Sequence, residues 1–363
     1  MEPAETVHVE LGVRSYDIVI GSGNLRDAVP EIGRQMQLSH AVVITDDNVE
    51  TPHAIAVAES LSDGADAVVD LMVIGAGETS KSVQTAELLW NRLLEANTDR
   101  KTGVVAVGGG VIGDLAGFIA ATYARGLRFV QIPTSLLAQV DSSVGGKVAV
   151  NLPAAKNMVG AFWQPTAVII DTRVLLTLPQ REYHAGLGEV VKYGVIQDAE
   201  LFEYLERNAG RLLARDDEVL RYVIARCCQL KAQVVQEDER EESGRRAILN
   251  YGHTFGHALE SATRYTQLLH GEAVAIGMLC ASRLAESLGM VNASLTARQK
   301  DLLTQFSLPV DVPPVDLETV LGAMHQDKKV AHGKLRFVLP TRLGHVELRE
   351  QINPELVRAA IRP

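Results

Sequence analysis

Cysteine and positive charge are both scarce in this sequence, and each shortage excludes a class of protein. The three cysteines, Cys227, Cys228 and Cys280, are odd in number and form no CxxC pair, so we expect neither a disulfide framework nor a thiolate zinc site. The 35 lysines and arginines face 45 acidic residues, which gives a net charge of −10. Because binding to a phosphate backbone needs a basic surface, nucleic acid is not expected as a partner.

Long uninterrupted hydrophobic runs are also missing. The most apolar stretch, residues 104–124, contains Asp114 and five glycines, which is not the composition of a membrane span. The first ten residues, MEPAETVHVE, have neither the basic nor the apolar region of a secretory signal. With 47% hydrophobic and 22% charged residues the composition is that of a globular protein, and we expect it in the reducing cytoplasm without a membrane partner.

The hydrophobic pattern differs between the two halves of the chain. In the first half, short β-branched runs alternate with helical patterns, which predicts βαβ units and a mostly parallel sheet. The predicted strands are residues 41–45, 67–74, 103–107, 129–132 and 167–171, and the clearest helices are 79–96 and 111–124. The opening runs VHVEL and YDIVI predict an antiparallel pair at the edge of the sheet.

From about residue 178 onward, long helical patterns dominate. They predict helices over residues 181–193, 199–208, 218–237, 247–263, 271–288, 294–306 and 355–361, with two short strands within 334–348. The length of 363 residues is enough for two cores. We therefore predict an α/β protein with a mostly parallel-sheet, Rossmann-like N-terminal domain (1–176) and an α-helical C-terminal domain (177–363).

A glycine-rich loop, residues 108–114, directly follows the strand pattern GVVAV and opens a predicted helix. It matches G-x-G-x-x-G in the context where glycines let the backbone approach a pyrophosphate at a helix N-terminus. No acidic residue ends the next strand, and the candidate ribose ligands lie instead in residues 45–48. The loop indicates a dinucleotide site of unusual layout, or a tight turn without a ligand. The segment 77–81 either joins that site or only caps the next helix through Thr79 or Ser80.

Histidines at helical spacing form a candidate metal site. His253 and His257 are four residues apart, which places both imidazoles on one helix face. His270 opens the next predicted helix and offers a third imidazole. A catalytic metal site needs a further ligand, and Glu189, behind a pair of glycines, is the best candidate carboxylate. Ordinary core or surface histidines can show the same spacing, so the pattern alone leaves both interpretations open.

Several basic residues lie in apolar or glycine-rich surroundings. They are Lys147, Lys156, Lys192, Lys231, Arg246, Lys328 and Lys329. Each one alone is typical of a solvated charge. Together with the glycine loop and the histidines, they predict an anionic substrate, and a phosphate in particular.

Six motifs, in this order, give the sequence a specific resemblance that runs along nearly the whole chain. They are GETSKS, GGGVIGDLAGFIAATYARG, PTSLLAQVDSSVGGKVAVNLPAAKN, REYHAGLGEVVKYG, NYGHTFGHALE and LHGEAVAIGM. The sequence resembles the 3-dehydroquinate synthase family of the shikimate pathway, within the sugar-phosphate cyclases. The resemblance implies an NAD-binding parallel-sheet domain, a helical domain that carries Zn²⁺ or Co²⁺, and an active site in the cleft between them.

The resemblance also implies a role for individual residues. The metal ligands would be Glu189, His253 and His270, and His257 would contact substrate instead. The NAD-binding residues would be Asp46, Asn48, Glu78, Lys81, Gly109, Gly110, Asp114, Thr134, Ser135, Asp141, Thr177 and Leu178, with Lys147 and Lys156 adjoining. The substrate-binding and catalytic residues would be Lys147, Lys156, Asn157, Lys192, Lys231, Arg246, Asn250 and His257. Arg125 would reach the active site of a second subunit in a homodimer. Ser135 replaces a threonine common in the family, and the loop over residues 238–246 is one residue longer than in common bacterial members.

The implied reaction converts 3-deoxy-D-arabino-heptulosonate 7-phosphate into 3-dehydroquinate and phosphate. Its steps would be transient oxidation by NAD, elimination of phosphate, reduction by the same cofactor, ring opening and aldol closure. Other sugar-phosphate cyclases share these motifs and differ in the substrate pocket, whereas metal-dependent polyol dehydrogenases would not explain the lysines. A non-catalytic NAD-binding protein is disfavoured because every expected functional position is filled.

Overall fold

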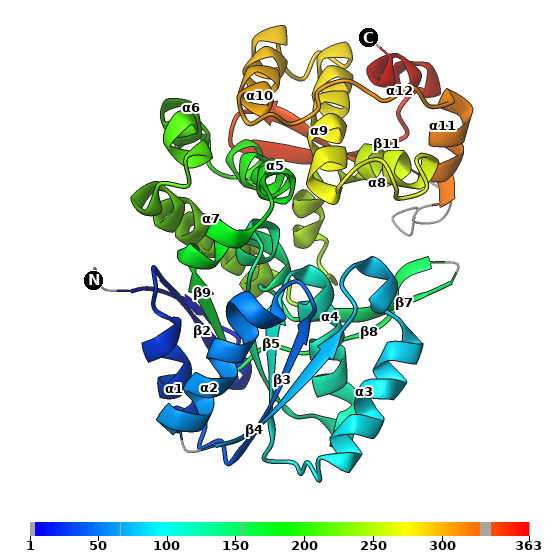
Figure 1. The fold of residues 1–363 in the computed structure, drawn as a ribbon. Coiled ribbons are helices and arrows are strands. Elements are labelled where there is room, and N and C mark those ends of the chain that lie inside the picture. Colours follow the sequence, from blue (N-terminus) through cyan, green and yellow to red (C-terminus); the bar gives the residue numbers. More distant parts are fainter. Residues whose placement is uncertain (1–3, 66, 154, 327–334, 363) are drawn as a thin grey trace. The chain divides into compact units, whose positions relative to one another are not determined.

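The computed structural model describes residues 4–65, 67–153, 155–326 and 335–362, and the chain divides into two compact units (Figure 1). Unit 1 comprises Met1–Leu178 and Leu220–Arg240, and unit 2 comprises Pro179–Val219 and Glu241–Pro363. The predicted domains were continuous in sequence, whereas residues 220–240 group with unit 1. Lys328 and Lys329, predicted among the basic residues, lie outside the described residues.

Unit 1 is built on a mostly parallel sheet, as predicted. Among the described residues its seven strands lie in the order β1-β2-β9-β6-β5-β3-β4. Their bounds are β1 (Glu5–Val9), β2 (Tyr16–Gly21), β3 (His40–Asp46), β4 (Val68–Ile74), β5 (Gly103–Gly108), β6 (Arg128–Pro133) and β9 (Ala167–Asp171). Only β1 runs antiparallel to its neighbour, which confirms the predicted edge pair. The central strands are mostly hydrophobic because helices cover both faces of the sheet.

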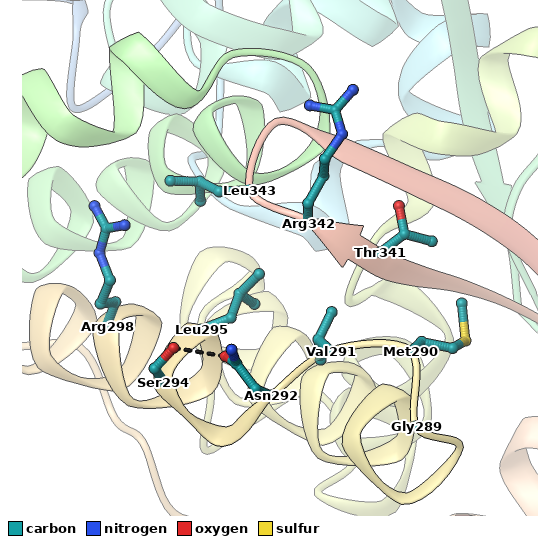
Figure 2. Close-up of a pocket in the computed structure, with 10 residues that line it drawn as sticks. All are labelled: Gly289, Met290, Val291, Asn292, Ser294, Leu295, Arg298, Thr341, Arg342 and Leu343. Atoms are coloured by element: carbon teal, nitrogen blue, oxygen red, sulfur yellow. Dashed lines mark hydrogen bonds between the residues drawn. The ribbon is translucent and has the colours of Figure 1, made fainter.

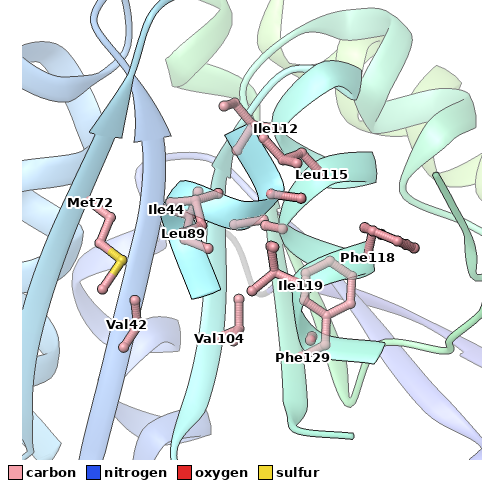
Figure 3. Close-up of a cluster of buried hydrophobic side chains, with 14 of the residues drawn as sticks. Val42, Ile44, Met72, Leu89, Val104, Ile112, Leu115, Phe118, Ile119 and Phe129 are labelled. Atoms are coloured by element: carbon pink, nitrogen blue, oxygen red, sulfur yellow. The ribbon is translucent and has the colours of Figure 1, made fainter. Parts of the chain in front are cut away.

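Four helices form those two layers. The helices α1 (Leu25–Gln35) and α2 (Ile55–Ala65) pack on one face through a cluster that includes Val43, Leu61 and Val105. The helices α3 (Val83–Glu95) and α4 (Gly110–Thr122) cover the other face. Figure 3 shows the second cluster, in which Leu115 and Ile119 of α4 meet strand residues of the sheet. Residues 220–237 of α7 (Asp217–Glu237) complete unit 1. The three cysteines of the chain are buried and form no disulfide.

A two-stranded antiparallel ribbon, which the sequence analysis did not predict, projects from unit 1. It pairs β7 (Lys147–Leu152) with β8 (Ala155–Phe162). Val148 and Val150 of β7 are buried in the core beside α4, whereas Met158 and Phe162 of β8 are 53% and 42% exposed. The ribbon therefore buries one face of its first strand and leaves much of its second strand at the surface.

Unit 2 is largely helical. It contains α5 (Gln180–Ile196), α6 (Ala199–Leu213), α8 (His253–Ala262), α9 (His270–Ser287), α10 (Ala293–Gln305), α11 (Leu317–Gln326) and α12 (Pro354–Ile361), with a hairpin of β10 (Arg336–Arg342) and β11 (His345–Glu350). The helix α9 is buried along most of its length and lies against α5, α8, α10 and α12. None of the described helices combines the length and the hydrophobicity that a membrane crossing requires.

The helix predicted over residues 247–263 is interrupted. A 3-10 turn (Arg245–Asn250) comes first, and α8 begins only at His253. Gly252 between them has φ +79°, and a Cβ atom there would lie 2.9 Å from the backbone nitrogen of Met278 on α9. A continuous helix cannot include that left-handed residue, so the prediction was wrong at this point and the break places His253 at a helix N-terminus.

Candidate functional site

Close contact between α5 and α9 builds the centre of unit 2. A Cβ atom on Gly271 would lie 1.8 Å from the carbonyl oxygen of Ala185, so only glycine permits this approach. Gly271 follows His270, the first residue of α9, and Ala185 lies one helical turn before Glu189 on α5. The glycine contact therefore brings Glu189 to the start of α9.

Three predicted metal ligands converge there. The Nε2 atoms of His253 and His270 each lie 3.5 Å from Oε1 of Glu189. One ligand atom from each of the three residues lies within 4.8 Å of the other two. The carboxylate of Glu189 is fully buried, whereas the His270 side chain is 33% exposed. A buried carboxylate and two imidazoles thus share one small volume that remains open at His270.

The remaining ring nitrogens hold these imidazoles in place. Nδ1 of His253 lies 3.1 Å from the carbonyl oxygen of Tyr251, and Nδ1 of His270 lies 3.3 Å from Oε2 of Glu260. Both partners accept a hydrogen bond from Nδ1, so the Nε2 atom of each ring faces the shared volume. Glu260 was missed by the sequence analysis, although its position three residues after His257 on a helix was a usable signal.

Charge is concentrated around Glu189. The ammonium group of Lys192, one helical turn further along α5, forms an ion pair with the Glu189 carboxylate, and both side chains are buried. Burial lowers the pKa of His270, but hydrogen bonds to Glu189 and Glu260 outweigh it and raise the pKa to about 10. The site thus attracts positive charge at the position of His270.

His257 lies beside this group. Its ring centroid is 5.4 Å from that of His253 and 5.9 Å from that of His270. It forms a second candidate ligand group with Glu260 and His270, and not with Glu189. The helical spacing of His253 and His257 therefore does not identify the three side chains that surround Glu189.

The three converging residues fit a zinc-type or cobalt-type ion. Imidazole nitrogen and carboxylate oxygen are typical ligands of Zn²⁺, and three protein ligands leave a position for substrate. Two ligand atoms bonded at about 2.0–2.2 Å in a tetrahedral arrangement lie roughly 3.3–3.6 Å apart. The two separations of 3.5 Å between Glu189 and the histidines match this spacing.

The carboxyl ends of the parallel strands in unit 1 form a second candidate site. The chain passes from β3 through α2 on one face, and from β5 through α4 on the opposite face, so a topological switch point lies between β3 and β5. Ligands of open α/β sheets bind at such a point. Asp46 ends β3 and Gly109 caps α4 after β5, so predicted NAD residues flank the switch point on both sides.

The first turn of α4 is open to an anion. No side chain caps this helix and no acidic residue lies in its first turn. A Cβ atom on Gly110 would lie 3.2 Å from Oγ of Ser142, so a larger residue would crowd the loop. A helix N-terminus with glycines in front of it suits a pyrophosphate.

An ion-pair cluster lies beside this loop. Nζ of Lys81 is 2.9 Å from Oδ2 of Asp114 and 3.4 Å from Oε1 of Glu78, and Asn151 donates to Glu78 over 2.8 Å. Burial lowers the pKa of Lys81, but the carboxylates of Asp114 and Glu78 outweigh it and the net shift is upward. The side-chain cap of α3 is Ser82 and not Thr79 or Ser80, so the interpretation of residues 77–81 as a helix cap was wrong.

The other predicted residues of unit 1 have varied surroundings. Lys231 of α7 lies 2.9 Å from Oδ1 of Asp141, and Thr177 shares a 2.7 Å hydrogen bond with His53. Thr134 is buried, Ser135, Lys156 and Leu178 are half-buried, and Asn48, Arg125, Lys147 and Asn157 are exposed. In unit 2, Arg246 is buried with Nε 3.8 Å from Oε1 of Glu241, and Asn250 ends the 3-10 turn before α8.

A separate hollow of about 530 Å³ lies in unit 2 between the loop before α10 and the β10–β11 turn (Figure 2). Its lining includes Met290, Arg298 and Arg342, and no predicted site residue. The guanidinium of Arg298 is paired with Glu206 at 2.6 Å. The hollow is therefore not a candidate for the predicted chemistry.

Known proteins resemble this chain along most of its length. Family models for the N-terminal and C-terminal parts of 3-dehydroquinate synthase match residues 71–185 and 186–330. A 3-dehydroquinate synthase from Rhodopirellula baltica is 51% identical over 366 residues, which cover 99% of this chain and 97% of that protein. A 2-deoxy-scyllo-inosose synthase solved with carbaglucose-6-phosphate, NAD⁺ and Co²⁺ is 28% identical and superposes with a TM-score of 0.90 over 99% of both chains. A 2-epi-5-epi-valiolone synthase from Streptomyces hygroscopicus, solved with NAD⁺ and Zn²⁺, is 29% identical with a TM-score of 0.88 over 97% of this chain and 96% of that one.

Proposed function

Because the chain belongs to the 3-dehydroquinate synthase family and has that family's activity, we propose that it works with NAD and one divalent ion, Zn²⁺ or Co²⁺. Its substrate is 3-deoxy-D-arabino-heptulosonate 7-phosphate and its products are 3-dehydroquinate and phosphate. The observation that carries the proposal is the 51% identity over 99% of the chain, in a protein whose Glu189, His253 and His270 converge. The two solved cyclases with other products share only 28% and 29% identity, which favours this substrate over theirs.

Glu189, His253 and His270 hold the ion in this proposal. When bound, the ion supplies Lewis acidity that lowers the pKa of a substrate hydroxyl. The chain would orient both Nε2 atoms toward the ion by committing each Nδ1 to an acceptor, Tyr251 O or Glu260 Oε2.

The switch point between β3 and β5 holds NAD, which supplies reversible hydride transfer. The open N-terminus of α4, with Gly109 and Gly110, receives the pyrophosphate, and Asp46 and Asn48 lie where ribose hydroxyls are bound. The other proposed contacts are Glu78, Lys81, Asp114, Thr134, Ser135, Asp141, Thr177 and Leu178. Lys81 holds the carboxylates of Glu78 and Asp114 in one geometry beside this loop.

Basic and amide side chains bind the anionic substrate. They are Lys147, Lys156, Asn157, Lys192, Lys231, Arg246, Asn250 and His257. Ion pairs to the carboxylate and phosphate of the substrate fix its orientation, so that successive mild steps proceed without release of intermediates.

We also propose a homodimer in the cytoplasm. The edge strand β8 carries exposed Met158 and Phe162, and such an edge is a template for pairing with a second chain. Arg125, exposed and left-handed with φ +68°, precedes Gly126, against which Trp163 at the base of the ribbon packs. In this proposal a second copy pairs along this edge and meets Arg125. Three buried cysteines that form no disulfide suit a reducing compartment.

The test is release of phosphate from 3-deoxy-D-arabino-heptulosonate 7-phosphate. We expect phosphate and 3-dehydroquinate in equal amounts, a requirement for NAD without net NADH, and loss of activity with a chelator that added Zn²⁺ or Co²⁺ reverses. Stoichiometric NADH would indicate a dehydrogenase, and turnover only of other sugar phosphates would indicate a different cyclase.

A further inference from the structure

The two histidines of the candidate metal site are held by different kinds of acceptor. His253 and His270 are each the first residue of a helix, α8 and α9. The acceptor for His253 is a neutral backbone carbonyl, that of Tyr251 at 3.1 Å. The acceptor for His270 is the carboxylate of Glu260 at 3.3 Å, on a side chain only 9% exposed. A buried carboxylate is costly unless it has a partner, so its position needs an explanation.

The electrostatics of the site supply that explanation. Two helix N-termini meet here, and each carries a partial positive charge that disfavours a cation. Lys192 adds a full positive charge beside Glu189. With Glu189 as the only carboxylate, a divalent ion would give this buried site a large positive net charge. Glu260 supplies a second negative charge at the side of His270 away from Glu189.

The local fold holds Glu260 in place. Its backbone carbonyl accepts hydrogen bonds from the backbone nitrogen of Tyr265 at 2.8 Å and from Oγ1 of Thr263 at 3.1 Å. These bonds fix the last turn of α8, from which the Glu260 side chain reaches His270. The carboxylate itself is buried and hydrogen-bonded to His270, so it is not a solvated surface group.

We propose that Glu260 is a positioning residue for His270, without contact to the ion or the substrate. Its carboxylate accepts the proton on Nδ1, which sets the ring orientation and directs Nε2 at the volume shared with Glu189. Its charge also makes the imidazole a stronger ligand and offsets the charge of the ion. This inference rests on the metal site of the proposed function.

The test measures Co²⁺ binding by the full chain, prepared without metal, in competition with a chromophoric chelator. Glu260→Gln keeps an acceptor oxygen but removes the charge, and Glu260→Ala removes both. Glu206→Gln is the matched control, because it also removes a carboxylate from an ion pair of unit 2, the pair with Arg298. The visible spectrum of bound Co²⁺ reports ligand geometry, and the melting temperature of the metal-free protein reports whether each variant is folded.

We expect Glu260→Ala to weaken Co²⁺ binding about 10- to 100-fold and to shift the Co²⁺ absorption bands, the usual scale for loss of such a partner. Glu260→Gln should lie between Glu260→Ala and the wild type, and Glu206→Gln should match the wild type. Wild-type affinity and spectrum in both Glu260 variants would overturn the inference. Two Co²⁺ ions per wild-type chain would also overturn it, because Glu260 would then be a ligand in the group with His257 and His270.

Variants of the ligands separate this inference from the proposed function. His270→Ala and Glu189→Gln should lose tight Co²⁺ binding altogether. If both retained it, the metal site itself would be misassigned. If both lost it while the Glu260 variants bound Co²⁺ like the wild type, only the role of Glu260 would fail.

Discussion

Replacing Lys192 by Met should destabilise the metal-free protein strongly and the metal-bound protein much less. Lys192 and Glu189 form an ion pair in which the two side chains are 1% and 0% exposed. Methionine fills a similar volume but removes the ammonium group that is paired with this buried carboxylate. A divalent ion at Glu189 would replace the missing positive charge, so metal should restore most of the lost stability.

The magnitude follows from burial. Removing one partner of a buried ion pair costs about 3–5 kcal/mol, because the remaining charge is uncompensated. For a unit of this size, each kcal/mol lowers the melting temperature by roughly 2–4 °C, so we expect a decrease of about 6–20 °C without metal. The double variant Glu189→Gln/Lys192→Met removes both charges and should regain most of the loss, since replacing a whole buried pair is often nearly neutral.

A double-mutant cycle tests this by calorimetry, with and without Zn²⁺. Its four proteins are the wild type, Glu189→Gln, Lys192→Met and the double variant. The pair of Glu31 and Arg34 on α1 has the same spacing, but both side chains are 52% exposed, so the same cycle there is the control. We expect a much smaller effect for that surface pair. The reasoning from the buried pair is wrong if the melting temperature of Lys192→Met changes as little as that of Arg34→Met. It is also wrong if the double variant is no more stable than Lys192→Met.

Three further predictions concern the metal ligands, Arg125 and His53. His253→Ala and His270→Ala should abolish turnover and lower the metal content in elemental analysis, with the far-ultraviolet circular dichroism spectrum unchanged; a variant with full metal and full activity would refute the assignment. Arg125→Ala should raise the KM for substrate without changing NAD or metal affinity, and a fully active monomer in light scattering would contradict its proposed role in a dimer. Burial lowers the pKa of His53, so the unfolded chain binds more protons and stability should fall as the pH drops through about 6.5; equal acid sensitivity in His53→Gln, measured by denaturant titration at several pH values, would show that His53 is not responsible.

The strands of unit 1 could be predicted because their signal is local. A buried parallel strand is hydrophobic along its length, and β3 and β5 show this directly in sequence. The helix α1 is hard to predict because it contains Pro30, which has no N–H group for the carbonyl of Arg26. Oγ of Ser60, on α2, donates to that carbonyl over 3.3 Å, and Gly64 of α2 leaves room for the proline ring. Both compensations come from a different helix, so no pattern within α1 could reveal them.

The ligands of the candidate metal site could also be predicted only in part from patterns within one helix. Spacing along α8 identifies two imidazoles on one face, but it does not say which of them meets Glu189. That choice depends on where α5 and α9 touch, and the contact depends on Gly271, where any side chain would collide with Ala185. In the sequence, Gly271 is only a residue of low helix propensity. In the structure, its close contact lets Nε2 of His270 lie 3.5 Å from Oε1 of Glu189. A substitution such as Gly271→Ala should therefore separate α5 from α9 and weaken metal binding, although it changes no ligand and no charge.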